Sequence, residues 1–226
     1  MKEQDFIMLI MNCKAYKSKA EYQKQTWLKY IPEYLKYYHV IGIKDLKEEY
    51  KFDNDNNILY VKNKDDYNSL PHKVITSYKA ILENFKFKYV YKTDDDQILV
   101  NFKFLNTLSN LLKIKEPKTH YGGFVINVDT PYISQYHKIH PELPTDLKIY
   151  KTKYCSGRFY FLSMESIKCL MSKKELISKE YLEDYAIGFY LHEYLKKDIF
   201  HICTNQFFTD IEKSDYPNIM SKNMIN

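Results

Sequence analysis

Residues 89–96, YVYKTDDD, decide the fold of this chain. Residues typical of a buried strand run directly into three consecutive aspartates at positions 94–96. In an open α/β sheet the ligand crevice lies at the carboxyl ends of the strands. We therefore expect an α/β fold with a mainly parallel central sheet, flanked by helices, and the acidic cluster at the edge where ligands bind.

The chain before this stretch alternates between strand-like and helix-like patterns. Apolar runs typical of strands occupy Phe6–Met11, Val40–Ile43 and Ile58–Val61. Helical periodicity covers Glu21–Tyr38, with a break near Pro32. A second helix is expected to open at Pro71, and its buried stripe consists of Val74, Tyr78, Ile81 and Leu82.

The chain after the aspartates is less regular. We expect strands over Gly122–Ile126 and Phe159–Leu162, a turn at Ser156-Gly157, a long loop over Pro131–Pro144 and a helix from Glu183-Asp184. No repeat, linker or composition break divides the sequence, so one domain over residues 1–226 is expected.

Composition excludes several classes of protein. The net charge is +5, but the lysines are scattered beside acidic residues, so no nucleic-acid partner is expected. The four cysteines lack zinc spacing, and reduced thiols are the expectation. The apolar run Phe6–Met11 is too short to span a membrane and lacks a cleavage site, which indicates a strand. Arg158 is the only arginine, which marks it as a residue of interest.

The three aspartates allow more than one interpretation. Adjacent carboxylates repel one another by roughly 1 kcal/mol per pair even in a water-like dielectric. A solvated turn or helix cap tolerates such a cluster, whereas a hard cation such as Mg²⁺ or Mn²⁺ would use it. A strand ending in Asp-x-Asp also resembles haloacid-dehalogenase-like phosphatases, although Ile98 stands where that family has Thr or Val. Position at the expected sheet edge favours the cation.

Five segments, in order, resemble one family of enzymes. They are residues 24–27 (KQTW), 66–73 (DYNSLPHK), 89–101 with the aspartates and Val100-Asn101, 154–163 (YCSGRFYFLS) and 183–188 (EDYAIG). In this combination the chain resembles glycosyltransferase family 31, the β-1,3-galactosyltransferase and Fringe-like group. The resemblance extends from Lys24 to Gly188 and so covers most of the sequence.

That resemblance implies a GT-A fold and an activity. The expected reaction is an inverting transfer of a hexose from a UDP-sugar to a hydroxyl of a glycan or glycoprotein acceptor, with Mn²⁺ or Mg²⁺ and a β-1,3-type linkage. The residues that the resemblance assigns to these roles are Asp96 and His201 for the metal, Asp94 and Asp95 for the ribose and metal-bound waters, Lys24 and Lys73 for the phosphates, Gly157 for the donor sugar, and Asp184 as the catalytic base.

Some of these residues also have simpler explanations. Lys24 replaces the family's arginine and loses bidentate phosphate contact. Acidic residues are favoured at the start of a helix without catalysis, which applies to Glu183 and Asp184. A histidine on an apolar strand, such as His201, is more often packed in a core. A non-catalytic sugar- or nucleotide-binding module of the same fold therefore stays an alternative.

The expected location follows from features that family relatives have and this sequence lacks. No membrane anchor or stem precedes the catalytic segments, and lysine and asparagine are abundant. We therefore expect a cytoplasmic or virus-associated protein without a membrane span. The oligomeric state and the identities of both sugars depend on details that the sequence does not carry.

Overall fold

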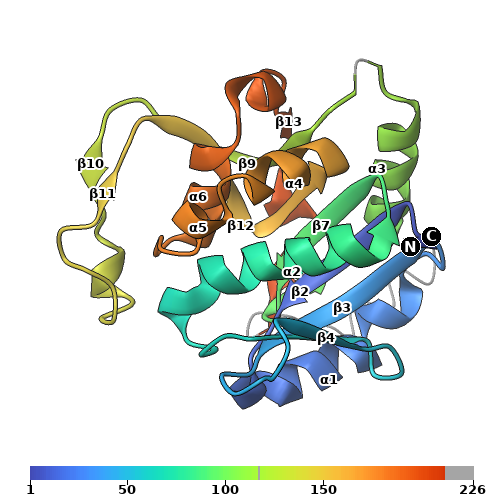
Figure 1. The fold of residues 1–226 in the computed structure, drawn as a ribbon. Coiled ribbons are helices and arrows are strands. Elements are labelled where there is room, and N and C mark those ends of the chain that lie inside the picture. Colours follow the sequence, from blue (N-terminus) through green and yellow to red (C-terminus); the bar gives the residue numbers. More distant parts are fainter. Residues whose placement is uncertain (117, 212–226) are drawn as a thin grey trace.

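The computed structural model describes residues 1–116 and 118–211. Within those residues a central sheet of eight strands has the order β13-β9-β12-β7-β2-β3-β5-β4. The neighbours β13–β9, β7–β2, β2–β3 and β3–β5 are parallel, whereas β12 and β4 run antiparallel to their neighbours. The mainly parallel α/β sheet expected from the sequence is therefore confirmed (Figure 1).

The elements of the described chain have the following bounds. The central strands are β2 (Phe6–Met11), β3 (Leu35–Gly42), β4 (Tyr50–Asp53), β5 (Ile58–Val61), β7 (Tyr89–Asp94), β9 (Tyr121–Val128), β12 (Thr152–Ser163) and β13 (Phe200–His201). Smaller sheets pair β1 (Lys2–Glu3) with β6 (Phe85–Lys86), β10 (Tyr132–Ile133) with β11 (Lys148–Ile149), and β8 (Gln97–Leu99) with β14 (Phe208–Asp210). The α-helices are α1 (Lys17–Gln25), α2 (Leu70–Asn84), α3 (Lys103–Ile114), α4 (Met164–Met171), α5 (Lys174–Ile177) and α6 (Glu183–Tyr190). Short 3₁₀ helices are η1 (Lys14–Tyr16), η2 (Trp27–Tyr30), η3 (Tyr67–Ser69), η4 (Tyr136–Lys138), η5 (Glu193–Lys196) and η6 (Thr204–Gln206).

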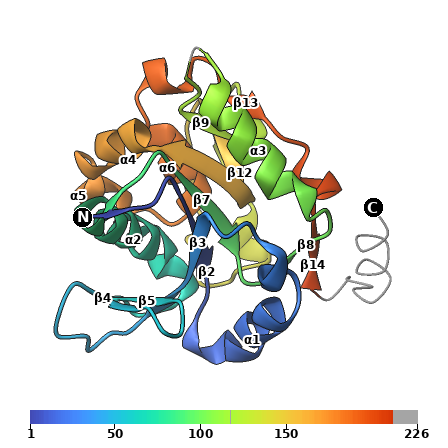
Figure 2. The same ribbon diagram turned by 90° about the vertical axis from the view of Figure 1, so that its right-hand side faces the viewer.

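Helices cover both faces of the central sheet. Figure 2 shows α2 and α4 on one side of the sheet, and α1 and α3 on the other. Val74, Ile167 and Ile187 belong to the core on the first side, and Trp27 and Leu105 belong to the core on the second. Every residue of β2 is buried, because successive side chains of the strand enter the two cores alternately.

Helix α2 forms where the sequence predicted it. Asp66 closes the preceding turn, since its Oδ1 accepts a hydrogen bond from the Ser69 amide at 2.8 Å. Pro71 occupies the first turn of the helix, where its missing N–H costs nothing. Val74, Tyr78 and Ile81 are buried, as the expected stripe requires, and Leu82 is partly buried.

The helix expected over Glu21–Tyr38 is wrong in its second half. Helix α1 ends at Gln25, a 3₁₀ turn follows, and β3 already begins at Leu35. Pro32 explains the break, because a proline disfavours the helical conformation of the residue before it. Ile31 is accordingly extended, with φ −68° and ψ 149°.

The connection between β3 and β5 also differs from the expectation. The charged stretch Lys44–Asp53 ends in a strand, β4, which forms an antiparallel hairpin with β5. Residues 54–57 form the turn between these two strands. Strand β3 is thus followed by β4 and not by a helix, so strands and helices do not alternate strictly in this part of the chain.

Ser156 and Gly157 lie within β12 and not in the turn expected there. The pairing of β12 with β9 changes register between Cys155 and Tyr160. Such an irregularity removes backbone groups from the ladder and makes them available to other partners. The expected strand over Phe159–Leu162 is therefore only the second half of a longer one.

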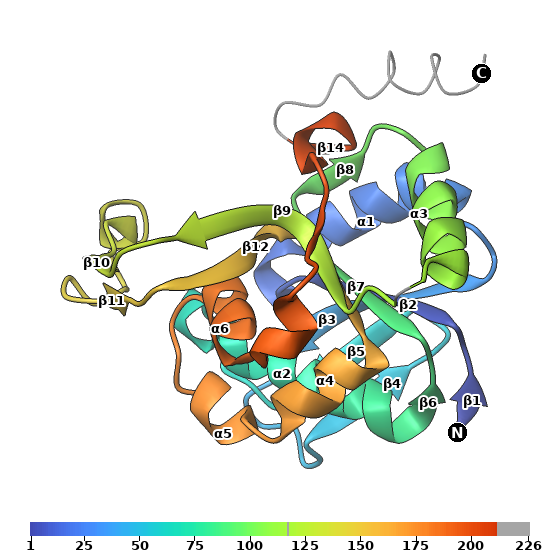
Figure 3. The same cartoon turned by 90° about the horizontal axis from the view of Figure 1, so that it is seen from above.

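Strands β9 and β12 continue beyond the sheet as an arm that carries β10 and β11 (Figure 3). The loop expected over Pro131–Pro144 lies at the end of this arm and contains β10 and η4. One residue of the loop, His140, stacks on Tyr67 with ring centroids 3.9 Å apart and planes 10° apart. This stack joins the arm to η3.

Two further features of the described residues concern the whole fold. No helix among them combines the length and apolar character needed to cross a bilayer. The four cysteines, Cys13, Cys155, Cys169 and Cys203, are unpaired.

Gly188 offers a test of the packing between α6 and β12. A methyl group at this position would lie 2.2 Å from Tyr154 Cβ and 2.9 Å from the Lys153 carbonyl oxygen. We expect Gly188→Ala to lower the free energy of unfolding by about 1–3 kcal/mol because of this overlap. Helix propensity alone predicts the opposite sign, a gain of about 1 kcal/mol. Urea unfolding followed by circular dichroism decides between them, and a stabilised variant would contradict the packing described.

Candidate active site

A polar cleft opens at the carboxyl ends of β2 and β7, where the sequence placed a ligand site. Its volume is about 700 Å³. Asp94, Asp95 and Asp96 line it from β7 and the turn that follows, and Asp184 lines it from the first turn of α6. The structure thus brings the acidic cluster and the expected base into one cavity.

Lys92 is a buried charge at the base of this cleft. Only 1% of its side chain is exposed, and its Nζ lies 2.8 Å from Asp94 Oδ1 and 3.0 Å from Glu183 Oε2. The same ammonium donates a hydrogen bond to the Gly157 carbonyl oxygen at 2.8 Å. Burial alone would lower the pKa of Lys92, but the two carboxylates raise it, so the side chain stays protonated. Its three donors hold β7, β12 and α6 together.

A chain of hydroxyl groups continues from Glu183 into the core. The Tyr160 hydroxyl donates to Glu183 Oε1, and it lies 2.7 Å from the Tyr78 hydroxyl. Because the Tyr160 proton is already used, Tyr78 is the donor in that second bond. Burial raises the pKa of both tyrosines, which keeps both protons in place.

Asp184 is held by two backbone amides. Its Oδ2 accepts a hydrogen bond from the Gly157 amide at 3.0 Å, and its Oδ1 accepts one from the Tyr185 amide at 2.7 Å. Burial raises the pKa of Asp184, although Lys92 and the two amides oppose the increase. A positioned carboxylate with a raised pKa in a cleft has the properties of a general base.

Gly157 is the point at which β12 approaches both carboxylates of α6. A Cβ at this position would lie 3.2 Å from Lys92 Nζ, 3.6 Å from Glu183 Oε2 and 3.7 Å from Asp184 Oδ2. A larger side chain would therefore enter the ion-pair cluster. The sequence assigned Gly157 to the donor sugar, and that contact stays a prediction.

The three consecutive aspartates have three different environments. Asp94 is paired with Lys92, and burial raises its pKa to about 6. Asp95 is buried, with its amide bound to the Met11 carbonyl oxygen at 3.0 Å and the pKa of its carboxyl raised by burial to about 7. Asp96 Oδ1 accepts a hydrogen bond from the Gln97 side-chain amide at 2.9 Å.

The carboxylates suit a hard divalent cation, but they supply few ligands. Among the residues that the structure describes, no group of three or more His, Cys, Asp or Glu side chains is arranged to hold a metal ion. Asp94 already pairs with Lys92, whereas the second oxygen of Asp96 has no hydrogen bond from a described residue. Mg²⁺ sites that serve phosphate substrates use one or two carboxylates together with phosphate oxygens. Asp96 therefore fits a cation that a diphosphate would help to hold.

Lys73 reaches the cleft with its charge already compensated. The side chain is buried, pairs with Asp65 and donates to the Asn12 carbonyl oxygen at 2.7 Å. Lys73 therefore secures the end of β2. Lys19 is a partly exposed lysine that also lines the cleft, and its Nζ lies 3.9 Å from Asp95 Oδ1.

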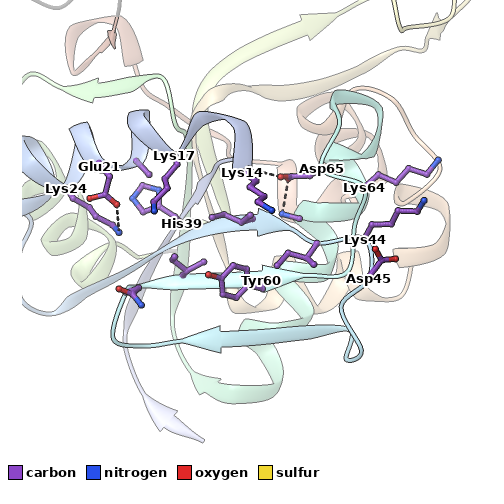
Figure 4. Close-up of a pocket in the computed structure, with 16 residues that line it drawn as sticks. Lys14, Lys17, Glu21, Lys24, His39, Lys44, Asp45, Tyr60, Lys64 and Asp65 are labelled. Carbon is purple, nitrogen blue, oxygen red and sulfur yellow. Dashed lines mark hydrogen bonds and ion pairs between the residues drawn. The ribbon is translucent and has the colours of Figure 1, made fainter.

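The structure does not bring Lys24 and His201 to the aspartates. Lys24 pairs with Glu21 at 3.4 Å and lines a separate groove of about 720 Å³ between α1 and strands β3 and β5 (Figure 4). His201 is exposed on β13 at the edge of the sheet, with its ring 5.4 Å from that of Phe124. We therefore leave both residues out of the site that we propose below.

Several residues of the cleft were not predicted from the sequence. Lys92 had a detectable signal, because residues two apart on a strand share a face and Lys92 thus accompanies Asp94. The cleft walls also include aromatic side chains that are distant in sequence, namely Tyr67, Tyr136, His140 and Tyr154. No local pattern could have gathered them.

Comparison with solved structures shows what the fold is similar to. A glycosyltransferase involved in the glycosylation of the major capsid of PBCV-1 matches with a TM-score of 0.50 and 8% identity, covering 98% of this chain and 100% of that one. A 2-C-methyl-D-erythritol 4-phosphate cytidylyltransferase of Francisella tularensis has a TM-score of 0.46 and 10% identity, over 97% and 99% of the two chains. The glycosyltransferase GlyE of Streptococcus pneumoniae TIGR4 has a TM-score of 0.46 and 11% identity, over 91% of this chain and 46% of that one. At these identities the similarity concerns the fold alone.

Comparison by sequence is more specific. No curated protein sequence gives a significant match. The family model described as galactosyltransferase matches residues 21–199, which include all five segments that resemble family 31, the three aspartates and Asp184. The chain therefore belongs to the galactosyltransferase family, and it is a glycosyltransferase with a GT-A type fold.

Proposed function

We propose that this protein is an inverting, metal-dependent hexosyltransferase that uses a UDP-sugar donor. One observation carries the proposal: Asp96 and Asp184 come from different elements and line one cleft. The contacts of Lys92 and Gly157 hold those elements together. In a sugar transfer, Asp96 would act at the leaving group and Asp184 at the nucleophile. The family match favours this activity over the phosphatase alternative.

Asp184 would act as the base in a single displacement. Its carboxylate takes the proton from an acceptor hydroxyl, whose oxygen forms a bond to the anomeric carbon of the donor sugar. The bond from that carbon to the diphosphate oxygen breaks on the opposite face, and the bonding electrons leave with UDP. One base and no covalent intermediate are sufficient for inversion. The backbone bonds from Gly157 and Tyr185 hold both oxygens of the base in place.

Asp96 would hold the cation at the other end of the reacting bond. When bound, Mn²⁺ or Mg²⁺ would offset the negative charge that grows on the departing diphosphate, a contribution of several kcal/mol. Lys19 lines the same cleft, with its Nζ 3.9 Å from Asp95 Oδ1, and would supply a further contact with phosphate. Asp94 and Asp95 would then contribute through the ribose or through metal-bound waters.

The aromatic wall supports a glycan or glycosylated acceptor. Tyr136 and His140 are parallel, with centroids 6.4 Å apart, and both line the cleft. Tyr136 is half exposed, so a ligand in the cleft can reach it. Aromatic faces with a few convergent polar groups are typical of sites that bind small organic ligands, sugars among them. Screening UDP-galactose, UDP-glucose and the two UDP-N-acetylhexosamines for binding would identify the donor.

Replacing the base separates catalysis from binding. We expect Asp184→Asn to lower kcat by about 10²- to 10⁴-fold, because the amide cannot accept the acceptor proton. UDP affinity, measured by calorimetry with Mn²⁺ present, should change little. Asp45→Asn, an exposed acid lining the other groove, is the matched control and should retain full activity. Equal rates of UDP release by wild type and Asp184→Asn would favour a binding module over an enzyme.

The raised pKa of Asp184 predicts the acid side of the pH profile. A base must be deprotonated to act, so kcat/KM should fall as the pH drops through the pKa of Asp184. Because burial raises that pKa, the fall should occur above the ordinary aspartate value of about 3.9. Initial rates at saturating metal, over a pH range in which circular dichroism shows an intact fold, measure it. A rate that stays flat down to about pH 4 would exclude Asp184 as the base.

Removing the proposed metal ligand tests the other half of the site. We expect wild type to bind UDP more tightly with Mn²⁺ than without it, and Asp96→Ala to lose this difference, at least about tenfold. UDP affinity without metal should be the same in both proteins and serves as the internal control. An unchanged metal dependence in Asp96→Ala would remove Asp96 from the metal site.

A further inference from the structure

Arg158, the only arginine of the chain, fastens the segment around η6 and β14 to β12. Its guanidinium donates through NH1 to Asn205 Oδ1 at 2.8 Å and through NH2 to Asp210 Oδ1 at 2.9 Å. A longer contact of 3.5 Å joins NH1 to the Phe208 carbonyl oxygen. A planar guanidinium can hold several acceptors at once in fixed geometry, which a lysine ammonium on a flexible stem cannot reproduce.

The contact with Asp210 continues towards the aspartate cluster. Asp210 Oδ1 also accepts a hydrogen bond from Gln97 Nε2 at 3.0 Å, and the same nitrogen donates to Asp96 Oδ1 at 2.9 Å. Two ionised carboxylates can only accept, so the Gln97 amide must present its NH₂ group to both. Gln97 is buried, which limits its freedom to move.

The backbone closes the same contact. Asp210 pairs with Gln97 in the antiparallel β14–β8 sheet, and the Ile211 amide donates to the Asp96 carbonyl oxygen at 2.7 Å. The turn that carries Asp96 is therefore held by residues more than a hundred positions away in sequence. Arg158 also offsets the repulsion between Asp96 and Asp210, which share one amide group.

We propose that Arg158 and Asp210 are positioning residues that act through Gln97 to orient the carboxylate of Asp96 for the cation. The proposal rests on the proposed function, because it assigns these residues a role at the metal site suggested there. Gln97 occupies Oδ1 of Asp96, and the second oxygen is left for the ligand. Arg158 and Asp210 are absent from the residues that line the cleft.

Charge and geometry make opposite predictions for this network. Removal of a positive charge near a cation site lowers the Coulomb repulsion and so strengthens cation binding. Loss of the orientation of the Asp96 carboxylate weakens that binding. Arg158→Lys retains the charge and loses the planar contact, so it isolates geometry. Arg158→Met removes both.

The experiment is a titration of the full chain with Mn²⁺ at saturating UDP, with free Mn²⁺ measured by electron paramagnetic resonance. We expect Mn²⁺ affinity to fall about threefold to tenfold in Arg158→Lys and at least tenfold in Arg158→Met. Metal-free UDP affinity should not change in either variant. Asn205→Ala removes the other side-chain partner of Arg158 and leaves the contact with Asp210 in place, so it should bind Mn²⁺ as wild type does.

Two additional variants keep the outcomes distinct. Asp210→Ala removes the acceptor of both Arg158 and Gln97 and so tests the same network from its other end, and it replaces the Arg158 variants if circular dichroism shows that they do not fold. Combined with Arg158→Lys, it should weaken Mn²⁺ binding little further, because both changes break one connection. Mn²⁺ affinities of the Arg158 and Asp210 variants within twofold of wild type, with Asp96→Ala impaired, would overturn the positioning role alone. An unimpaired Asp96→Ala would overturn the metal site and this inference together.

Discussion

The buried ammonium of Lys92 is the interaction on which the rest of the site depends. Removing such a group from water costs several kcal/mol, and only close, well-aligned partners can repay that cost. Lys92 has three partners, Asp94, Glu183 and the Gly157 carbonyl oxygen, and each belongs to a different element. Strand β7, strand β12 and helix α6 must therefore keep one relative arrangement. Asp184 follows Glu183 on that helix, so the contacts of Lys92 also fix the position of Asp184.

The arrangement explains why three identical residues in a row do different things. Asp94 neutralises Lys92, Asp95 is enclosed near the end of β2, and Asp96 turns towards the segment that contains Asp210. Asp94 ends strand β7 whereas Asp95 and Asp96 lie in the turn that follows, so the consecutive carboxylates point in different directions and meet different partners. A run of acidic residues in a sequence therefore supplies several candidate ligands, and the surrounding elements determine the role of each residue.

The sequence predicted the parts of this protein that depend on local pattern. The apolar run of β2, the proline-initiated α2, and the strand that ends at the aspartates were recognisable because short-range chemistry specifies them. The continuity of β12 through Gly157 was not recognisable, since the partners that require it, Lys92 and Asp184, are distant in sequence. Lys24 was assigned to the phosphates because of a motif, but helix α1 places its side chain in the neighbouring groove.

The connection between Asp96 and Asp210 has a consequence for the order in which the site can form during translation. The strands that carry Lys92 and the aspartates leave the ribosome long before residues 204–211, which complete the Asp210–Gln97–Asp96 contact. A domain generally folds as a unit during synthesis. The acidic turn therefore acquires its last support only when β14 has emerged, after almost all of the described chain has been made. Synthesis that stops before β14 would leave the acidic turn without this support.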